Sequence, residues 1–523
     1  MSLSRRTFLM GTAVTGVAAA MPFAWADRVR SDSGTRMPSS KLPKPFTVPF
    51  ARPPASVPFR TTTTTDFHLI RMAATSLEIL PGFQTDLWAY NGSVPGPTIR
   101  AQRGRQVVAR FANHLPGIHP VLGYEAYTSI HLHGAASQPE YDGYASDITH
   151  PGQLKDYKYR NVENSRSLWY HDHAVHHTWT NVYMGLAGQY FIIDPADARF
   201  GLPTGEYDVP LHLSDALFQA DGQLFLTPDD TKGIWGDVML VNGRPWPAMP
   251  VKRRKYRFRL VNGCVSRSLF WRLSTNDPFQ VISTDDGLVP TPITVNKVRH
   301  VNGERYDIVV DFAKYPAGTR VMLMNDSLPY NQDYTNTNKI MAFDVTDEPF
   351  DPTNNDVPAE LATDNPVMTL AAPKGAKVRT FQTVRQGGEW TVNGHTWNDV
   401  IASRYQLVAA SPAVGATEIW ELRNESGGWI HPFHIHGVDG RLLSRNGAPP
   451  YPYEAGPKDT YWMGPGHTLR VLMKFELPGK YMMHCHNGVH EDHDMMVQYE
   501  TVDPANEEDP FSAPCEDDVG QPL

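Results

Sequence analysis

One pattern occurs three times along the chain and decides its fold. It appears in residues 89–113, AYNGSVPGPTIRAQRGRQVVARFAN, in residues 240–263, LVNGRPWPAMPVKRRKYRFRLVNG, and again from residue 391, TVNGHTWNDV. The Asn-Gly dipeptides begin at 91, 242 and 393, so both intervals are 151 residues. Each copy continues as an alternating strand pattern that ends at Asn113, Asn262 or Asn424. Because Asn-Gly is a strong signal for a two-residue hairpin turn, this equal spacing predicts three repeats of one β unit.

The remaining sequence also favours an all-β fold. Short β-rich runs such as QYFII (189–193) and YDIVV (306–310) are separated by turn residues, and long helical periodicity is scarce. We therefore expect a β-sandwich in each repeat, with three consecutive domains at residues 61–195, 205–348 and 367–502.

The two ends of the chain differ from this pattern. Residues 27–60 are rich in proline and are expected to form an extended arm that lies on a domain. Residues 503–523 hold seven acidic and no basic residues, which predicts a loose acidic tail.

The first 26 residues have the features of a targeting segment. Residues 4–9, SRRTFL, form a twin-arginine pattern, a short apolar run follows, and AWA at 24–26 offers a cleavage site. The run is shorter than the roughly 20 residues of a membrane span, so we expect no span. Residues 1–26 thus predict export to the periplasm or the outside of the cell, with an uncleaved amphipathic anchor as the alternative.

Composition narrows the function and directs attention to histidine. The chain has 523 residues, a formal charge of −9, three cysteines and 21 histidines. The acidic balance argues against a nucleic-acid partner, and three cysteines cannot form a disulfide scaffold. Histidine is the residue type that stands out in this composition.

Eight of the histidines form four His-x-His pairs. Residues i and i+2 of a strand face the same side, so each pair presents two imidazoles together. The first pairs of repeats one and three lie 40–43 residues after their Asn-Gly asparagine, where repeat two has Ile282–Thr284. We therefore expect repeats one and three to face each other and bind two or three copper ions, although imidazole also suits zinc and iron. The pairs are His131 and His133, His171 and His173, His434 and His436, and His484 and His486.

A second kind of site is centred on Cys485. Strand alternation sends its side chain to the face opposite its neighbours His484 and His486. With His431, His490 and Met495 it makes two imidazoles, a thiolate and a thioether, which is the ligand set of a blue copper site. A structural zinc site is the alternative.

Four motifs resemble the signatures of the multicopper oxidases. They are HLHG (131–134), WYHDH (169–173), HPFHIHG (431–437) and HCHNGVHEDHDMM (484–496). The likeness covers the whole mature chain, and segments such as Ile234–Asp237 and Tyr256–Arg259 are similar to the bilirubin oxidase branch, with spore-coat laccases as near relatives. The resemblance implies three cupredoxin-like Greek-key β-sandwich domains.

The resemblance also implies a role for each candidate ligand. It predicts four copper ions: one type 1, one type 2 and two type 3. Type 1 would use His431, Cys485, His490 and axial Met495; type 2, His131 and His434; type 3, His133, His171 and His486 on one ion and His173, His436 and His484 on the other.

Two acidic residues match carboxylates that the family places beside its cluster. Asp142 and Glu491 are therefore expected to relay protons to bound oxygen. The alternatives are an ordinary Asp-Gly turn for Asp142 and a supporting or surface carboxylate for Glu491.

Six further residues are not assigned as copper ligands or to the proton relay. Trp429 either packs on the type 1 site or belongs to the core, and Cys264 and Cys515 are the only pair left for a disulfide. His176, His177 and His493 are expected to be bystanders.

The resemblance implies an exported oxidase with O2 as electron acceptor and a small-molecule donor, acting as a monomer. Its donors would be phenols, aromatic amines or tetrapyrroles such as bilirubin. A metallo-oxidase of Mn(II), Cu(I) or Fe(II) is the alternative, although the scattered methionines disfavour Cu(I). A degenerate scaffold or a pure electron carrier is disfavoured, because no ligand is lost and a carrier needs no set of eight imidazoles.

Overall fold

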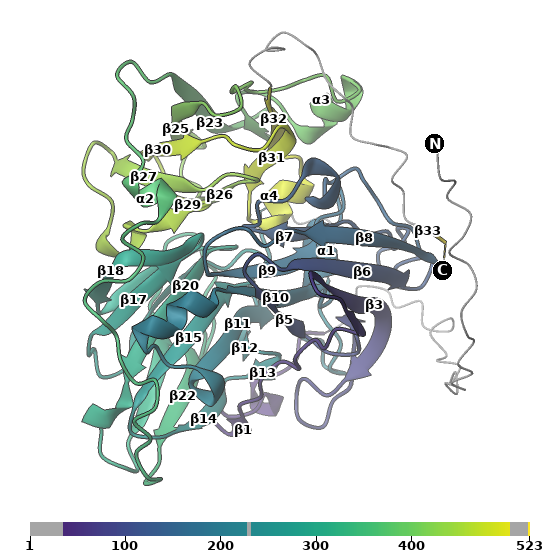
Figure 1. The fold of residues 1–523 in the computed structure, drawn as a ribbon. Helices are drawn as coiled ribbons and strands as arrows, with labels where there is room; N and C mark the ends of the chain where they lie inside the picture. The colour runs from purple at the N-terminus through teal and green to yellow at the C-terminus, as the bar shows by residue number, and fades with distance from the viewer. Residues whose placement is uncertain (1–34, 227–231, 503–520, 523) are drawn as a thin grey trace.

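The computed structural model describes residues 35–226, 232–502 and 521–522, and its described part consists mainly of β-strands (Figure 1). The predicted targeting segment and residues 503–520 of the predicted tail lie outside the described residues. Six sheets pack in pairs into three successive sandwiches, seen in Figure 1 as purple to blue, teal, and green to yellow. The expected all-β class is confirmed.

The first sandwich joins two sheets through aromatic side chains. The rings of Phe111 and Tyr170, one from each sheet, lie 5.7 Å apart. One sheet has the order β2 (Arg60–Thr61), β3 (Thr65–Leu77), β6 (Gln106–His114), β8 (Gln153–Tyr159) and β33 (Gln521–Pro522), with β4 (Thr85–Tyr90) on β3; the other has β5 (Gly96–Gln102), β10 (Ala187–Ile193), β9 (Arg166–Asp172) and β7 (Ile130–His133).

The second sandwich is built in the same way, with Phe258 and Phe343 from its two sheets 4.9 Å apart. Its first sheet runs β13 (Arg244–Pro245), β12 (Val238–Val241), β11 (Asp208–Ala216), β15 (Lys255–Asn262), β20 (Arg305–Asp311), β17 (Phe279–Thr284) and β18 (Gly287–Val295). The second sheet runs β1 (Val48–Pro49), β14 (Pro247–Val251), β22 (Lys339–Val345), β21 (Arg320–Asn325), β16 (Leu269–Leu273) and β19 (Lys297–His300).

The third sandwich has its own core, in which the rings of Trp420 and Tyr499 from the two sheets lie 5.2 Å apart. One sheet runs β24 (Glu389–Val392), β23 (Val378–Gln386), β25 (Thr417–Asn424), β30 (Thr468–Lys474), β27 (Gly440–Arg445) and β28 (Pro457–Lys458). The other runs β29 (Thr460–Met463), β26 (His431–Ile435), β31 (Gly479–Cys485) and β32 (Met496–Thr501).

Helices are short and lie in the connections. The α-helices of the described chain are α1 (Thr178–Tyr183), α2 (Pro366–Thr369), α3 (Trp397–Ala402) and α4 (Gly488–Asp492). Single 3₁₀ turns occur at Ser39–Lys41, Pro139–Tyr141, Pro195–Phe200, Gly205–Tyr207, Phe312–Lys314 and Pro452–Glu454. Within the part of the chain that the structure describes, no helix combines the length and apolar character that crossing a bilayer requires.

The repeat predicted from Asn-Gly is present in all three sandwiches. Asn91, Asn242 and Asn393 have φ values of 50°, 51° and 53°, and each following glycine also has positive φ, as a type I′ hairpin turn requires. Each asparagine side chain accepts a hydrogen bond from a backbone N–H of the strand that lies before the hairpin, which is β3, β11 or β23. In each repeat this strand also pairs in parallel with a strand that follows the hairpin: β3 with β6, β11 with β15, and β23 with β25.

The proline-rich arm joins the first two sandwiches. Its strand β1 pairs with β14 of the second sandwich, whereas β2 pairs with β3 of the first. Arg36 also forms a 2.7 Å ion pair with Asp237. At the other end of the chain, Gln521–Pro522 pairs with β8, so the end of the acidic tail lies on the first sandwich.

Candidate metal centres

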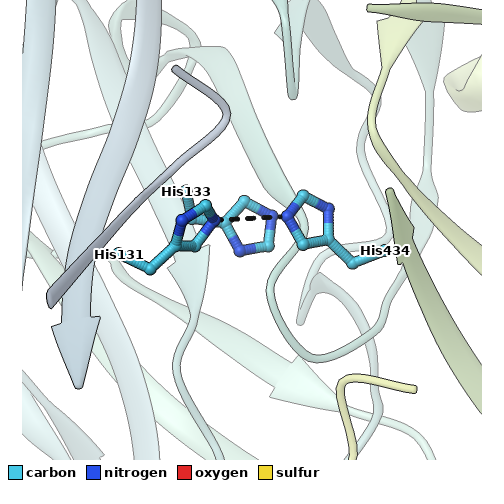
Figure 2. Close-up of side chains that lie close together, drawn as sticks. All are labelled: His131, His133 and His434. Atoms are coloured by element: carbon cyan, nitrogen blue, oxygen red, sulfur yellow. Dashed lines mark hydrogen bonds between the residues drawn. The ribbon is translucent and has the colours of Figure 1, made fainter. Parts of the chain in front are cut away.

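The eight paired histidines meet where the first sandwich contacts the third. The first sandwich supplies two of the pairs from β7 and the end of β9, and the third sandwich supplies the other two from β26 and the end of β31. All eight side chains are buried. Figure 2 shows the imidazoles of His131, His133 and His434 grouped together, with the ring of His133 between the other two in this view and a dashed line joining His131 to His434.

The ring nitrogens of these histidines approach closely. Nε2 of His484 lies 3.1 Å from Nε2 of His173 and 3.1 Å from Nε2 of His436. Nε2 of His131 and Nε2 of His434 are 3.4 Å apart. The nitrogens form three groups, each within 4.8 Å: His131, His133 and His434; His133, His171 and His486; and His173, His436 and His484.

In several of these imidazoles, the outer nitrogen, which is the one directed away from the other histidines, forms a hydrogen bond to a neighbouring oxygen. Nδ1 of His434 donates to the carbonyl oxygen of Asp459 at 3.1 Å, and Nδ1 of His171 donates to that of Asp172 at 2.8 Å. Because the outer nitrogen carries the proton, the inner nitrogen of a neutral ring carries a lone pair directed at the cluster.

These inner lone pairs fit metal cations. Burial lowers the pKa of His173 to about 4, so this ring is neutral at neutral pH. Nε2 of His171 is buried and has no hydrogen-bond partner among the described residues. Several inward lone pairs without donors leave a cation as the group that satisfies them.

A second donor set lies within the third sandwich. Sγ of Cys485 is 3.4 Å from Nδ1 of His431 and 3.6 Å from Nδ1 of His490, and the two nitrogens are 3.3 Å apart. Metal–ligand bonds of about 2.0–2.3 Å would give separations of this size. Burial raises the pKa of the Cys485 thiol, so a bound cation is needed to keep it as thiolate.

Met495 is buried beside this set. Its backbone N–H donates to the carbonyl of His490 at 3.0 Å, and its carbonyl accepts from the N–H of Cys485 at 3.1 Å. The methionine is therefore attached by its backbone to two of the three donors.

Cys485 connects the two centres through the covalent chain. Its neighbours His484 and His486 belong to two different groups of the histidine cluster. Nδ1 of His484 also lies 3.1 Å from the carbonyl oxygen of Cys485. Cys485 is thus one residue away, in each direction along the chain, from a histidine of the cluster.

The two predicted carboxylates lie beside the cluster. Asp142 Oδ2 accepts a 2.9 Å hydrogen bond from Nδ1 of His436, and burial raises the pKa of Asp142 well above its usual range. Glu491 Oε2 lies 3.2 Å from Nδ1 of His484, and Oε1 lies 3.5 Å from Nε2 of His173. Burial opposes ionisation of Glu491, but His484 and His173 hold its pKa below the usual range.

Trp429 contacts the cysteine site, although another tryptophan is closer. Its ring meets His490 edge-on at 5.8 Å, whereas Trp390, which the sequence analysis missed, lies 4.1 Å from the same imidazole. The described donor groups do not include His176, His177 or His493.

The predicted disulfide stays a prediction. Cys264 is buried with a free thiol, and Cys515 lies outside the described residues.

Supporting residues outside the motifs were also missed. Asp459 lies 3.3 Å from Nε2 of His133 and accepts two hydrogen bonds from Arg305 of the second sandwich, at 2.8 and 2.6 Å. Ser426 lies 2.8 Å from Nε2 of His431. No periodic spacing marks these residues: Asp459 is 326 positions from His133 in the sequence, and Ser426 lies in the loop before β26.

Comparison with known proteins adds independent findings. The sequence matches the family model for multicopper oxidase at residues 71–197 and again at residues 370–505. It is 40% identical to bilirubin oxidase of Albifimbria verrucaria, covering 87% of this chain and 81% of that protein. It is 33% identical to a laccase of Bacillus subtilis (strain 168), covering 80% and 91%. The crystal structure of a laccase from Pediococcus acidilactici Pa5930 superposes with a TM-score of 0.78 at 29% identity, covering 88% and 95%.

Proposed function

This chain belongs to the multicopper oxidase family, and from that premise we propose that it oxidises small aromatic donors at one copper and reduces O2 to water at a separate cluster of three. One observation carries the proposal: Cys485 belongs to a His₂Cys donor set, while its two neighbours belong to the eight-histidine cluster.

Each donor group would hold one ion. His431, Cys485 and His490, with Met495 as axial ligand, would hold the type 1 copper. His131 and His434 would hold the type 2 copper. The type 3 ions would be held by His133, His171 and His486 and by His173, His436 and His484. When bound, the copper ions supply one-electron oxidation of the donor and four-electron reduction of O2 to water.

The carboxylates would manage the protons that oxygen reduction consumes. Burial raises the pKa of Asp142 well above its usual range, which favours the protonated carboxyl and suits it to donate. Glu491 is ionised beside His484 and His173, and as a carboxylate between these two imidazoles it would be an acceptor in the proton relay.

The donor would approach through a small pocket at His490. Its walls include the aromatic rings of Trp235, Tyr330 and Trp429. Flat aromatic rings favour stacking with flat aromatic donors, which supports phenols, aromatic amines or tetrapyrroles over metal ions. The SRRTFL segment supports export before this reaction takes place.

The test is oxygen uptake by copper-loaded protein with bilirubin, a phenol, Mn(II) and Cu(I) supplied in parallel. We expect uptake with bilirubin and the phenol, together with a blue absorption band. Uptake with Mn(II) or Cu(I) alone would instead support the metallo-oxidase alternative.

A further inference from the structure

A short segment of the second sandwich covers the cysteine site. This capping segment, Lys232–Trp235, lies against helix α4, which carries His490, and against Asn487, which precedes the helix. The carbonyl oxygen of Lys232 lies 3.0 Å from Nε2 of His490, whose side chain is fully buried. Because a carbonyl can only accept, the imidazole donates through Nε2 and is left with a lone pair on Nδ1, which faces Cys485.

Three further hydrogen bonds hold the segment in place. The hydroxyl of Ser266 accepts from the backbone N–H of Ile234 at 3.0 Å and donates to Oδ1 of Asn487 at 2.8 Å. The Nδ2 group of Asn487 donates in turn to the carbonyl of Lys232 at 3.3 Å. Ser266 therefore joins the capping segment to the start of helix α4, which carries His490.

Gly233 is the residue that allows this approach. Its φ is 154°, a conformation that side chains rarely adopt. A Cβ added here would lie 2.7 Å from the ring of Trp235 and 3.0 Å from Cβ of Ser266. Any larger residue would therefore have to displace the ring of Trp235 or shift the peptide that carries the carbonyl of Lys232.

We propose that Gly233 is a positioning residue of the type 1 copper site, because it allows the Lys232 carbonyl to accept a hydrogen bond from His490. This hydrogen bond fixes the tautomer of the His490 ring and lowers the reduction potential of the bound copper. The inference rests on the proposed function, because it takes His490 as a copper ligand. A hydrogen bond from the outer nitrogen to an oxygen makes the imidazole a stronger electron donor and stabilises the oxidised ion. Since the carbonyl occupies that nitrogen, an aromatic donor would contact the capping segment and not the imidazole edge.

The test compares Gly233→Ala and Ser266→Ala with a matched control. Gly318→Ala replaces another positive-φ glycine of the second sandwich, where an added Cβ meets nothing within 4 Å. The readouts are the reduction potential of the blue copper and the solvent exchange of the His490 Nε2 proton, followed by NMR of the Cu(I)-loaded protein.

We expect a higher potential and roughly tenfold faster proton exchange in Gly233→Ala, the size of one lost hydrogen bond. Ser266→Ala, which removes only one hydroxyl, should shift both in the same direction, and Gly318→Ala should shift neither. A blue site with wild-type potential and exchange in both test variants would overturn this inference while leaving the proposed function intact. Copper-loaded wild type without a blue band would instead overturn the proposed function.

Discussion

At the scale of single residues, the two nitrogens of each ligand imidazole have different functions. In His436, Nδ1 is bonded to Asp142 while Nε2 faces His484 at 3.1 Å. In His431 the order is reversed: Nε2 contacts Ser426 and Nδ1 faces the cysteine. The hydrogen-bond partner therefore decides which nitrogen is available to a metal ion.

Asp142→Asn tests the proton role of the carboxylate. The amide oxygen can still accept from His436, but the group can no longer release a proton. We expect turnover to fall by about 100-fold or more, with copper content and the blue band unchanged.

The pH dependence of turnover tests the same role of Asp142. Because burial raises the pKa of Asp142, wild-type turnover should decrease as pH rises through that raised value and the proton is lost. The variant should lack this decrease. A variant with the wild-type rate and profile would exclude Asp142 as proton donor.

At the scale of elements, the Asn-Gly hairpins have equivalent backbones but different surroundings. Gly243 and Gly394 have φ values of 73° and 77° in the second and third repeats. A Cβ at Gly243 would clash with the carbonyl oxygen of Val94 in the first sandwich, whereas at Gly394 it would meet nothing within 4 Å.

Gly243→Ala should therefore destabilise the protein more than Gly394→Ala. Both substitutions have the cost of positive φ, about 1–2 kcal/mol. Only Gly243→Ala also displaces backbone at the contact with the first sandwich. Urea unfolding of both variants measures the difference, and equal midpoints would show that this contact contributes no stability.

The sequence predicted the elements better than it predicted their contacts. Paired histidines and equally spaced Asn-Gly turns are periodic, so strand geometry converts them directly into faces and hairpins. The contact of the Lys232 carbonyl could not be predicted in this way, because every residue has the same backbone acceptor whatever its side chain. Asp459 was missed because its role depends on Arg305, which lies 154 residues away in the chain.

At the scale of the whole molecule, buried charges join the three sandwiches beside the histidine cluster. Nζ of Lys458 in the third sandwich lies 2.7 Å from Asp285 and 2.9 Å from Glu304 of the second. Arg166 of the first sandwich forms a 2.8 Å pair with Asp439 of the third. The second sandwich supplies none of the paired histidines, yet its charges support the strands that do.

Lys458→Met tests this support. The substitution leaves Asp285 and Glu304 buried without their cation, so we expect the free energy of unfolding to fall by about 3–5 kcal/mol. Lys474→Met, which removes an exposed pair with Glu476, should change it by less than about 1 kcal/mol. Similar losses in both variants would contradict a special role for the buried pair.

In the proposed function, two distinct copper centres meet at Cys485. The most direct test of this arrangement is the copper content of fully loaded wild type and Cys485→Ser, measured together with the blue absorption band. We predict four copper ions and a blue band in wild type, and three ions without the band in the variant, because the eight imidazoles remain intact. Equal copper content in both proteins, or a blue band that survives the substitution, would contradict the presence of two copper centres that meet at Cys485.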